Sequence, residues 1–283
     1  MKIAVTGARG FIGGAFTAAA RRAGHDVLAL GRGPATQPGE ASWALGELLP
    51  AAAADADLVL HLASATLGSR EPKQAFELDV EGSRILIEQT RRLRREGRGP
   101  RLLFVSSQSA DPSAVNLYGR SKWAIESMLA EADEVIVRPG LVYGEAPVSV
   151  YAALSGLAAL PIVPVVSGPA AIHPIHVDDL ADCLLQIATL AAPERLWRLG
   201  AAPGMTLAQL LAGVARRQGH RPPIALPLPR PLVRLAARGV DLALRPPASM
   251  LERVDGLIGL KPMDSSESLR RLGRTLRPFS PAS

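Results

Sequence analysis

Two residues with complementary chemistry stand close together in the middle of the chain. Tyr118 and Lys122 belong to the segment YGRSK, and on a helix this spacing puts both side chains on one face. An ammonium group beside a phenol favours the phenolate, so Lys122 is expected to lower the pKa of Tyr118 toward neutrality. Ser107 follows the preceding apolar run and could bind the same substrate oxygen. The three residues suit proton transfer at a carbonyl or secondary alcohol.

A second candidate site lies at the N-terminus, which reads MKIAVTGARGFIGG. Gly7, Gly10 and Gly13 let the backbone turn sharply, admit a ligand where a Cβ would block it, and pack the next helix against a strand. The first N–H groups of that helix favour a phosphate, and a diphosphate is the expected ligand. Glycines in a turn can also be only a turn, and an ordinary amphipathic helix can carry a tyrosine and a lysine. Their order along one chain favours the chemical interpretation.

Short apolar runs alternate with helical stretches through the first half of the chain. This alternation predicts an α/β fold with a doubly wound parallel sheet of the nucleotide-binding type. The expected strands span residues 3–6, 27–30, 58–61, 102–106 and 135–138, and the expected helices begin near residues 11, 72 and 117.

The alternation loosens after residue 144, where proline-rich pieces such as LPIVPVV and RPPIALPLPRP appear. We expect a Rossmann-type domain from residues 1–143 and about 172–200. Residues of about 144–171 and 201–283 are expected to form a small C-terminal substrate-binding lobe over the carboxyl edge of the sheet. A helix beginning at Asp178, with that residue as its N-cap, would return the chain to the first domain.

Composition excludes several classes of protein. The 283 residues contain one cysteine, Cys183, so neither an internal disulfide nor a thiolate zinc cluster is expected, and Cys183 is interpreted as a buried helix residue. No apolar run approaches the roughly 20 residues that span a bilayer, and no signal peptide precedes the first strand. The net charge of +6 comes from arginines that are scattered along the chain, and the chain has few aromatic residues that could stack on bases. We therefore expect a cytoplasmic protein with no metal, nucleic-acid or membrane partner.

Together these segments resemble the extended short-chain dehydrogenase/reductases, which include NAD-dependent sugar-nucleotide epimerases, dehydratases and 4-ketoreductases. The resemblance covers nearly the whole chain. It is carried by TGARGFIGG at 6–14, DLVLHLAS at 57–64, LLFVSS at 102–107, YGRSK at 118–122, RPGLVYG at 138–144, HPIHVDDLAD at 173–182 and DSSESLRRLGRTLRP at 264–278.

The resemblance implies a nicotinamide dinucleotide cofactor and a role for each matching residue. Ser107, Tyr118 and Lys122 match the catalytic residues: Tyr118 exchanges a proton with the substrate oxygen during hydride transfer, and Lys122 also holds the cofactor ribose. Asn116 and Tyr143 are expected at the mouth of the pocket as substrate contacts. The residues expected along the cofactor are Gly7, Gly10, Phe11, Ile12, Gly13, Leu62, Ala63, Ser64 and Pro139.

The choice between NADP and NAD depends on the end of the second strand. An NAD-preferring protein places an acidic residue there for the ribose hydroxyls, whereas this chain has Gly31 followed by Arg32. Arg32 and Arg9 could hold a 2′-phosphate through their guanidinium groups. NADP is therefore the expected cofactor, while NAD stays open because either arginine could equally be a solvated surface residue.

Three departures from the family pattern weaken the assignment of a sugar nucleotide. The interval from Ser107 to Tyr118 is short, and Asp79 stands where the family usually has asparagine. The basic residue that helps to bind the diphosphate of such substrates is absent before the IHVDD segment. His173 and His176 could replace it, but structural hydrogen bonding is the expected role of both.

The leading hypothesis is an NAD(P)-dependent oxidoreductase or epimerase that transfers hydride at a carbonyl or secondary alcohol of a nucleotide sugar. One alternative is a non-catalytic NAD(P)-binding subunit for regulation or assembly. Another is a reductase of a hydrophobic carbonyl compound, which the apolar LPIVPVV segment favours. The resemblance also implies a homodimer. The sequence leaves the substrate, the stereochemistry and the choice between reductase, epimerase and dehydratase open.

Overall fold

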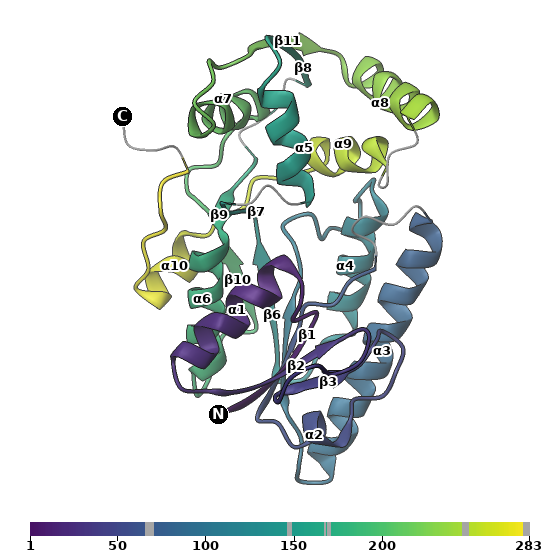
Figure 1. Cartoon of the computed structure of the whole chain (residues 1–283), viewed down its shortest axis with the longest axis vertical. Helices are drawn as coiled ribbons and strands as arrows, with labels where there is room; N and C mark the ends of the chain where they lie inside the picture. Colours follow the sequence, from purple (N-terminus) through teal and green to yellow (C-terminus); the bar gives the residue numbers. More distant parts are fainter. Residues whose placement is uncertain (66–70, 146–148, 167, 169–170, 245–248, 280–283) are drawn as a thin grey trace.

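The computed structural model describes residues 1–65, 71–145, 149–166, 168, 171–244 and 249–279 (Figure 1). Its central sheet consists of β1 (Lys2–Thr6), β2 (Asp26–Gly31), β3 (Glu40–Ser42), β4 (Leu58–His61), β5 (Arg101–Val105), β6 (Glu134–Pro139) and β10 (Leu196–Leu199). All neighbouring strands are parallel, in the order β10-β6-β5-β4-β1-β2-β3. From β1, the chain adds β2 and β3 on one side and then β4, β5 and β6 on the other, so the order of strands switches sides between β1 and β4. This arrangement confirms the Rossmann-type α/β prediction.

Both faces of the sheet are buried under helices. Successive side chains of a strand point to opposite faces, so Ile3 and Val5 join the apolar cluster on one face and Ala4 joins the cluster on the other. The first face is covered by α1 (Phe11–Arg22) and α6 (Val177–Thr189), and the second by α2 (Ala51–Ala54), α3 (Pro72–Arg95) and α4 (Leu117–Met128). Such burial on both sides explains why the strands read as continuous apolar runs.

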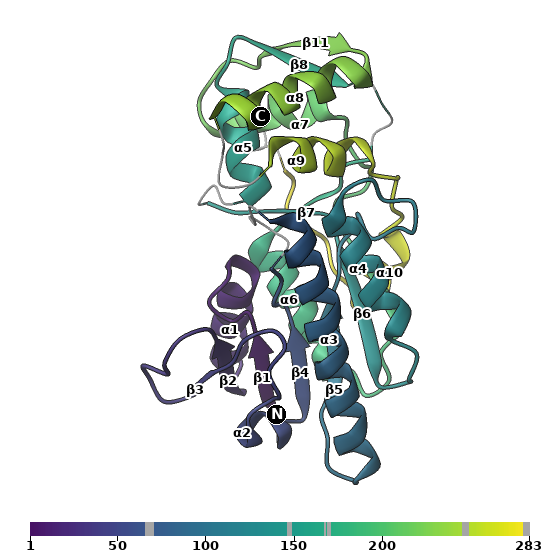
Figure 2. The ribbon, with the colours of Figure 1, turned by 90° about the vertical axis from the view of Figure 1, so that its right-hand side faces the viewer.

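A second group of elements lies above the carboxyl ends of the strands (Figure 2). It contains α5 (Ser149–Ala158), β8 (Ile162–Val166), α7 (Leu207–Arg217), β11 (Ile224–Leu228), α8 (Arg230–Leu244) and α9 (Met250–Ile258). These elements surround a third apolar cluster that includes Leu154, Val163 and Leu210. A short parallel pair, β7 (Leu141–Tyr143) with β9 (Pro174–His176), lies between the two groups.

We propose the division into two lobes that the sequence indicates, with one adjustment near the C-terminus. The expected smaller lobe included all of residues 201–283, but α10 (Ser266–Leu272) packs against β10 and α6 of the larger one. Leu272 is buried in the cluster on the first face of the sheet. The chain therefore returns to the sheet before it ends.

The start of α6 corrects one prediction. His176, and not Asp178, is the N-cap, because its Nδ1 accepts a hydrogen bond from the Asp178 N–H at 3.2 Å. Asp178 and Asp179 occupy the first helical turn, where a carboxylate favours the positive end of the helix dipole. Asp179 also accepts a hydrogen bond from Arg277 Nε at 2.8 Å. Both carboxylates therefore have structural roles.

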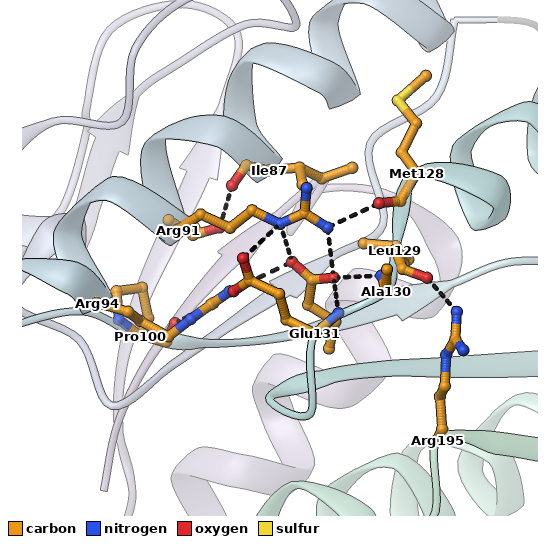
Figure 3. A network of polar contacts seen from close by, with 11 residues as sticks. Ile87, Arg91, Arg94, Pro100, Met128, Leu129, Ala130, Glu131 and Arg195 are labelled. Carbon is orange, nitrogen blue, oxygen red and sulfur yellow. Dashed lines mark hydrogen bonds and ion pairs between the residues drawn. The ribbon is translucent and has the colours of Figure 1, made fainter.

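A buried ion network fixes α3 against the start of β6 (Figure 3). The Glu134 side chain is fully buried and accepts hydrogen bonds from Arg91 Nε and Nη2 at 2.6 and 2.7 Å. It also accepts the N–H groups of Ala130 and Glu131. Because every carboxylate lone pair has a donor, the network ties both α3 and the segment after α4 to β6.

The part of the chain that the structure describes contains neither a membrane-spanning helix nor a metal-binding group of side chains. Within it, no helix is long and apolar enough to cross a bilayer. The same residues contain no group of three or more histidine, cysteine, aspartate and glutamate side chains that could hold a metal ion. Cys183 is buried in α6, as the sequence indicates.

Candidate active site

A cavity of about 520 Å³ opens at the carboxyl edge of the sheet, under the elements of the second group. It gathers most of the predicted site residues, from segments that are far apart in the sequence. Those that line it are Gly7, Gly10, Phe11, Ile12, Gly13, Leu62, Ser64, Ser107, Asn116, Tyr118 and Pro139. The cavity thus joins the expected cofactor site to the expected proton-transfer site.

The glycine turn has the close backbone approach that its spacing predicts. Gly7 has a φ of 69°, and a Cβ there would lie 2.9 Å from the Ala63 nitrogen. A Cβ on Gly13 would overlap the Gly7 carbonyl oxygen and lie 2.8 Å from the Ala8 Cα. Gly10 is the N-cap of α1 and has no side chain to bind the first N–H groups of the helix. The residues present therefore fit a dinucleotide diphosphate at this turn.

A buried polar chain supports this turn from below. Thr6 Oγ1 accepts the N–H groups of Leu62 and Ala63 at 3.1 and 3.2 Å, and it lies 2.8 Å from His61 Nδ1. His61 Nε2 lies 3.0 Å from Ser83 Oγ. Since two amides occupy the oxygen of Thr6, its hydroxyl proton is directed to His61 Nδ1, and Nε2–H donates to Ser83. Ala63 thus packs its backbone against Gly7 without lining the cavity.

Asp79 holds the next part of the cofactor segment. Its buried carboxylate accepts a hydrogen bond from Ser64 Oγ at 2.8 Å and one from the Ala65 N–H at 2.5 Å. The aspartate that departs from the family pattern therefore fixes the segment after β4. It also places a negative charge near Tyr118 and Lys122. This charge adds to the effect of burial on the pKa of Tyr118 and opposes the effect of burial on the pKa of Lys122.

The three candidate catalytic residues lie together, but Lys122 is not bound to Tyr118. Lys122 is buried, and its Nζ donates a hydrogen bond to the Val105 carbonyl oxygen at 3.1 Å. It lies 4.8 Å from the centre of the Phe104 ring and 5.8 Å from that of Tyr118. Ser107 makes a side-chain hydrogen bond with Tyr118, and its Oγ lies 2.9 Å from Ser109 Oγ.

Burial dominates the acid–base properties of this site. It raises the pKa of Tyr118 to about 12, with a smaller contribution from Asp79, although the hydrogen bond with Ser107 acts in the opposite direction. Burial also lowers the pKa of Lys122 to about 8, against the attraction of Asp79 and Glu126. The expectation that Lys122 brings the tyrosine pKa toward neutrality is therefore not met in this structure. Desolvation of the phenolate outweighs the effect of the more distant ammonium.

The two expected substrate contacts have different outcomes. Asn116 lines the cavity and also caps α4, since its Oδ1 accepts the Gly119 N–H at 3.3 Å. Tyr143 does not line the cavity, so this prediction is wrong. Its side chain is 1% exposed and packs edge-on against Phe279, with ring centres 4.8 Å apart. The pairing of β7 with β9 places Tyr143 in the third apolar cluster.

The two arginines expected to hold a 2′-phosphate, Arg9 and Arg32, differ in whether their guanidinium groups already have partners. The guanidinium of Arg9 donates to the Arg32 carbonyl oxygen at 2.9 Å and to Glu40 Oε2 at 3.0 Å. Hydrogen bonds from Thr36, together with Arg9, lower the pKa of Glu40 to about 2, so this partner is a carboxylate. Arg9 therefore braces the loop after β2. The Arg32 side chain is exposed and makes no hydrogen bond or ion pair with the described residues.

The remaining wall of the cavity is formed by residues that were not predicted from the sequence. The missed lining residues are Pro72, Ser106, Gln108, Ser109, Gly140, Leu141, Val142, Tyr151, Ser249, Glu252, Arg253, Gly256, Leu257 and Leu260. Gln108 and Ser109 adjoin the predicted serine, so their place in the sequence could have suggested them. No local signal marks α9, which is docked by the hydrogen bond from the Leu117 N–H to Glu252 Oε2 at 2.9 Å.

Both histidines for which a structural role is expected make backbone hydrogen bonds, His176 as the N-cap of α6 and His173 with two other segments. His173 Nδ1 lies 2.8 Å from the Ala201 carbonyl oxygen, and Nε2 accepts the Met263 N–H at 3.0 Å. Both ring nitrogens are therefore engaged away from the cavity, and His173 ties the strand before α6 to the C-terminal segment.

Comparisons with known proteins agree with this geometry. A family model described as the NAD dependent epimerase/dehydratase family matches residues 3–200. The chain is 28% identical over 255 residues to a ceramide reductase of Caulobacter vibrioides, covering 84% of this chain and 77% of that protein. Human epimerase family protein SDR39U1, solved with NADPH, has a TM-score of 0.71 at 20% identity over 98% of this chain and 95% of its own. A Thermus thermophilus UDP-glucose 4-epimerase complex with NAD has a TM-score of 0.58 at 21% identity, over 92% of this chain and 100% of its own.

Proposed function

The chain belongs to the NAD-dependent epimerase/dehydratase family, and on that premise we propose that it is an NADPH-dependent reductase of a carbonyl group carried by a largely apolar substrate. The observation that carries the proposal is the cavity itself. Ser107 and Tyr118 face the space where the cofactor turn meets a wall of apolar side chains. The proposal includes a cytoplasmic location, since it needs a supply of reduced cofactor.

The residues of the site suit the reductive direction. When bound, a nicotinamide dinucleotide supplies a hydride for the carbonyl carbon and is oxidised. With a pKa of about 12, Tyr118 is a neutral phenol at neutral pH and can donate its proton to the carbonyl oxygen. Ser107 can donate a hydrogen bond to the same oxygen. The phenolate then regains a proton from solvent, and the positive charge of Lys122 stabilises it in the interval.

The lining of the substrate side favours an apolar compound. Leu141, Val142, Tyr151, Leu257 and Leu260 come from β7, α5 and the region of α9. Contacts of this kind stabilise alkyl or aromatic groups by removing them from water. The name of the Caulobacter vibrioides relative, a ceramide reductase, supports the same substrate class.

A nucleotide sugar is the second candidate substrate, and one residue favours it. Among the described residues that line the cavity, Arg253 alone is basic. It makes no hydrogen bond or close ion pair with a described residue, although the Asp241 carboxylate is near enough to attract it. It could therefore meet a diphosphate. The epimerase names of several structural neighbours belong to proteins that use such substrates, among them one solved with UDP-glucose.

Activity measurements with two substrate classes test the proposal. Purified protein is given NADPH and either ketones with long alkyl chains or nucleoside-diphosphate 4-ketohexoses, and cofactor oxidation is followed. We expect turnover with the first class. Turnover only with the second class would establish the nucleotide-sugar alternative, and Arg253→Ala should then raise KM by about tenfold or more. Specific NADPH binding with no turnover in either class would favour the non-catalytic alternative.

A cofactor comparison tests the preference for NADP. Arg32→Ala should weaken NADPH binding by about 10-fold to 100-fold, since a charge-assisted contact to the 2′-phosphate is lost, and should leave NADH binding unchanged. Arg22→Ala is the matched control, because Arg22 is exposed at the end of α1. Equal effects on NADPH and NADH would contradict the proposed role of Arg32.

A further inference from the structure

The outer face of the small sheet in the second group is apolar and exposed. Ile162 of β8 stands in register with Ile224 of β11, and Pro164 stands in register with Leu226. Ile162 and Ile224 are 54% and 67% exposed, whereas the alternate residue Val163 is buried in the third cluster. Two-layer folds usually present polar side chains on such an outer face. The sheet is therefore apolar on both sides.

The next helix, α8, also exposes apolar side chains. In α8, Ala237 is buried, while Leu232, Leu235 and Leu242 are exposed, the last two at 65% and 80%. At 100° per residue the three leucines fall within an arc of about 80° on the side away from Ala237. The helix begins two residues after β11 ends and packs beside β8, at the top of Figures 1 and 2. Here we call Ile162, Ile224, Leu226, Leu232, Leu235 and Leu242 the α8–β11 surface.

The charges along the segment from α7 to α8 are almost all positive. Residues 207–244 contain six arginines and a single acidic residue, Asp241. Arg221, Arg230 and Arg238 are exposed and make no hydrogen bond or ion pair with any described residue. Arg238 lies one helical turn from both Leu235 and Leu242. Asp241 is itself engaged, since it accepts hydrogen bonds from Ser249 and the Met250 N–H.

We propose that the α8–β11 surface docks on an anionic lipid bilayer. Exposed aliphatic side chains flanked by unpaired arginines are the features by which interfacial helices bind such membranes: the leucines enter the acyl boundary, and the cations meet lipid phosphates. A second copy of the chain fits less well, because a symmetric contact would bring Arg238 and its neighbours against their own images. The sequence-based expectation of no membrane partner rested on the absence of a spanning run, which surface docking does not need.

The position of the surface connects it to the cavity. Arg234 of α8 pairs with Asp255 of α9 at 2.8 Å, and neighbouring residues of α9 line the cavity. A bilayer at the α8–β11 surface would thus be one helix away from the substrate site. The biological meaning of docking rests on the proposed function, since an apolar substrate would reach the cavity from the membrane. Membrane binding itself can be measured without substrate.

Vesicle flotation of the full-length protein tests the proposal. We expect binding to phosphatidylcholine vesicles that contain phosphatidylglycerol, weaker binding to pure phosphatidylcholine, and loss of binding at high salt. The double variant Leu235→Glu/Leu242→Glu should bind at least about tenfold more weakly, because both leucines lose their apolar contribution. Arg238→Ala should bind about fivefold more weakly. The control is Leu48→Glu, at a leucine that is 67% exposed far from this surface, and it should bind like the unchanged protein.

Three outcomes would overturn the proposal. They are no flotation of the unchanged protein with anionic vesicles, equal flotation of the double variant, or a stable dimer in light scattering that the double variant abolishes. Circular dichroism shows whether each variant is folded, and NADPH binding to the double variant reports on the separate site. Failure of vesicle binding with carbonyl reduction intact would reject the docking surface alone, whereas the reverse result would reject the proposed function alone.

Discussion

Lys122 Nζ lies 5.8 Å from the centre of the Tyr118 ring, yet its hydrogen bond goes to the Val105 carbonyl oxygen at 3.1 Å. The two residues share one face of α4, as their spacing predicts, but the lysine points past the tyrosine toward the end of β5. Burial therefore determines the acid–base behaviour of both groups. The tyrosine is a proton donor over the whole neutral range.

This relationship predicts the pH dependence of carbonyl reduction. Lys122 carries its charge below its pKa of about 8 and loses it above, while Tyr118 keeps its proton up to about pH 12. The kcat/KM for reduction should therefore be level below about pH 8 and fall as the ammonium that stabilises the phenolate is lost. Lys122→Met should be slow and should lack this alkaline limb. An unchanged limb in that variant would assign the titration to another group.

Removal of the Tyr118 hydroxyl tests the proton donor. Tyr118→Phe should lower kcat by about 100-fold to 10,000-fold, the usual contribution of general acid catalysis, and should leave NADPH binding intact. Tyr143→Phe is the matched control, because Tyr143 is buried outside the cavity, and it should keep full activity. Steady-state rates and a fluorescence titration measure the two effects. A strong loss of activity in Tyr143→Phe would restore this residue as a substrate contact.

Two adjacent glycines test the cofactor turn. Gly13→Ala puts a Cβ against the Gly7 carbonyl oxygen, so NADPH binding should be lost even where the protein folds. Gly14→Ala has its nearest neighbour, the Ala8 carbonyl oxygen, at 3.8 Å and should bind NADPH normally. Because alanine favours a helix interior, Gly14→Ala should raise the free energy of unfolding by about 1 kcal/mol. Equal binding by the two variants would mean that the turn does not depend on this close contact.

His61 predicts a loss of stability in acid. Its burial, with a smaller contribution from Lys122, lowers its pKa to about 3, while the unfolded chain binds this proton near pH 6.5. Between these values this histidine is protonated only in the unfolded state, so it should lower the free energy of unfolding by about 1.4 kcal/mol for each unit that pH decreases. Urea unfolding across this range measures the slope.

A matched pair of variants tests whether His61 causes this pH dependence of the free energy of unfolding. His61→Gln keeps one acceptor for Thr6 and one donor for Ser83 but cannot be protonated. It should therefore lose the dependence between about pH 6.5 and pH 5, above the range in which carboxylates of lowered pKa such as Glu40 contribute. His220→Gln, at an exposed histidine, should keep it. The prediction fails where both variants retain the slope of the unchanged protein.

The sequence by itself determined the features that depend on short spacings. The apolar runs predicted β1, β2, β4, β5 and β6, because a buried parallel strand must be apolar along its whole length. They did not predict the edge strands β3 and β10. The glycine turn and the Tyr118–Lys122 pair could be predicted for a similar reason, since a few residues of helix or turn fix their geometry. These patterns located the cofactor side of the cavity and its candidate proton donor.

Only the tertiary structure decided which side chains complete the cavity and how they are charged. The wall from α9 meets the start of α4 through a contact between Leu117 and Glu252, which no local pattern encodes. Tyr143 lies in the third apolar cluster, and Arg9 is held by Glu40 from the edge strand. The pKa values of Tyr118 and Lys122 depend on how much water the assembled elements exclude. Burial and long-range contact are properties of the packed chain, so the sequence placed the groups and packing determined their chemistry.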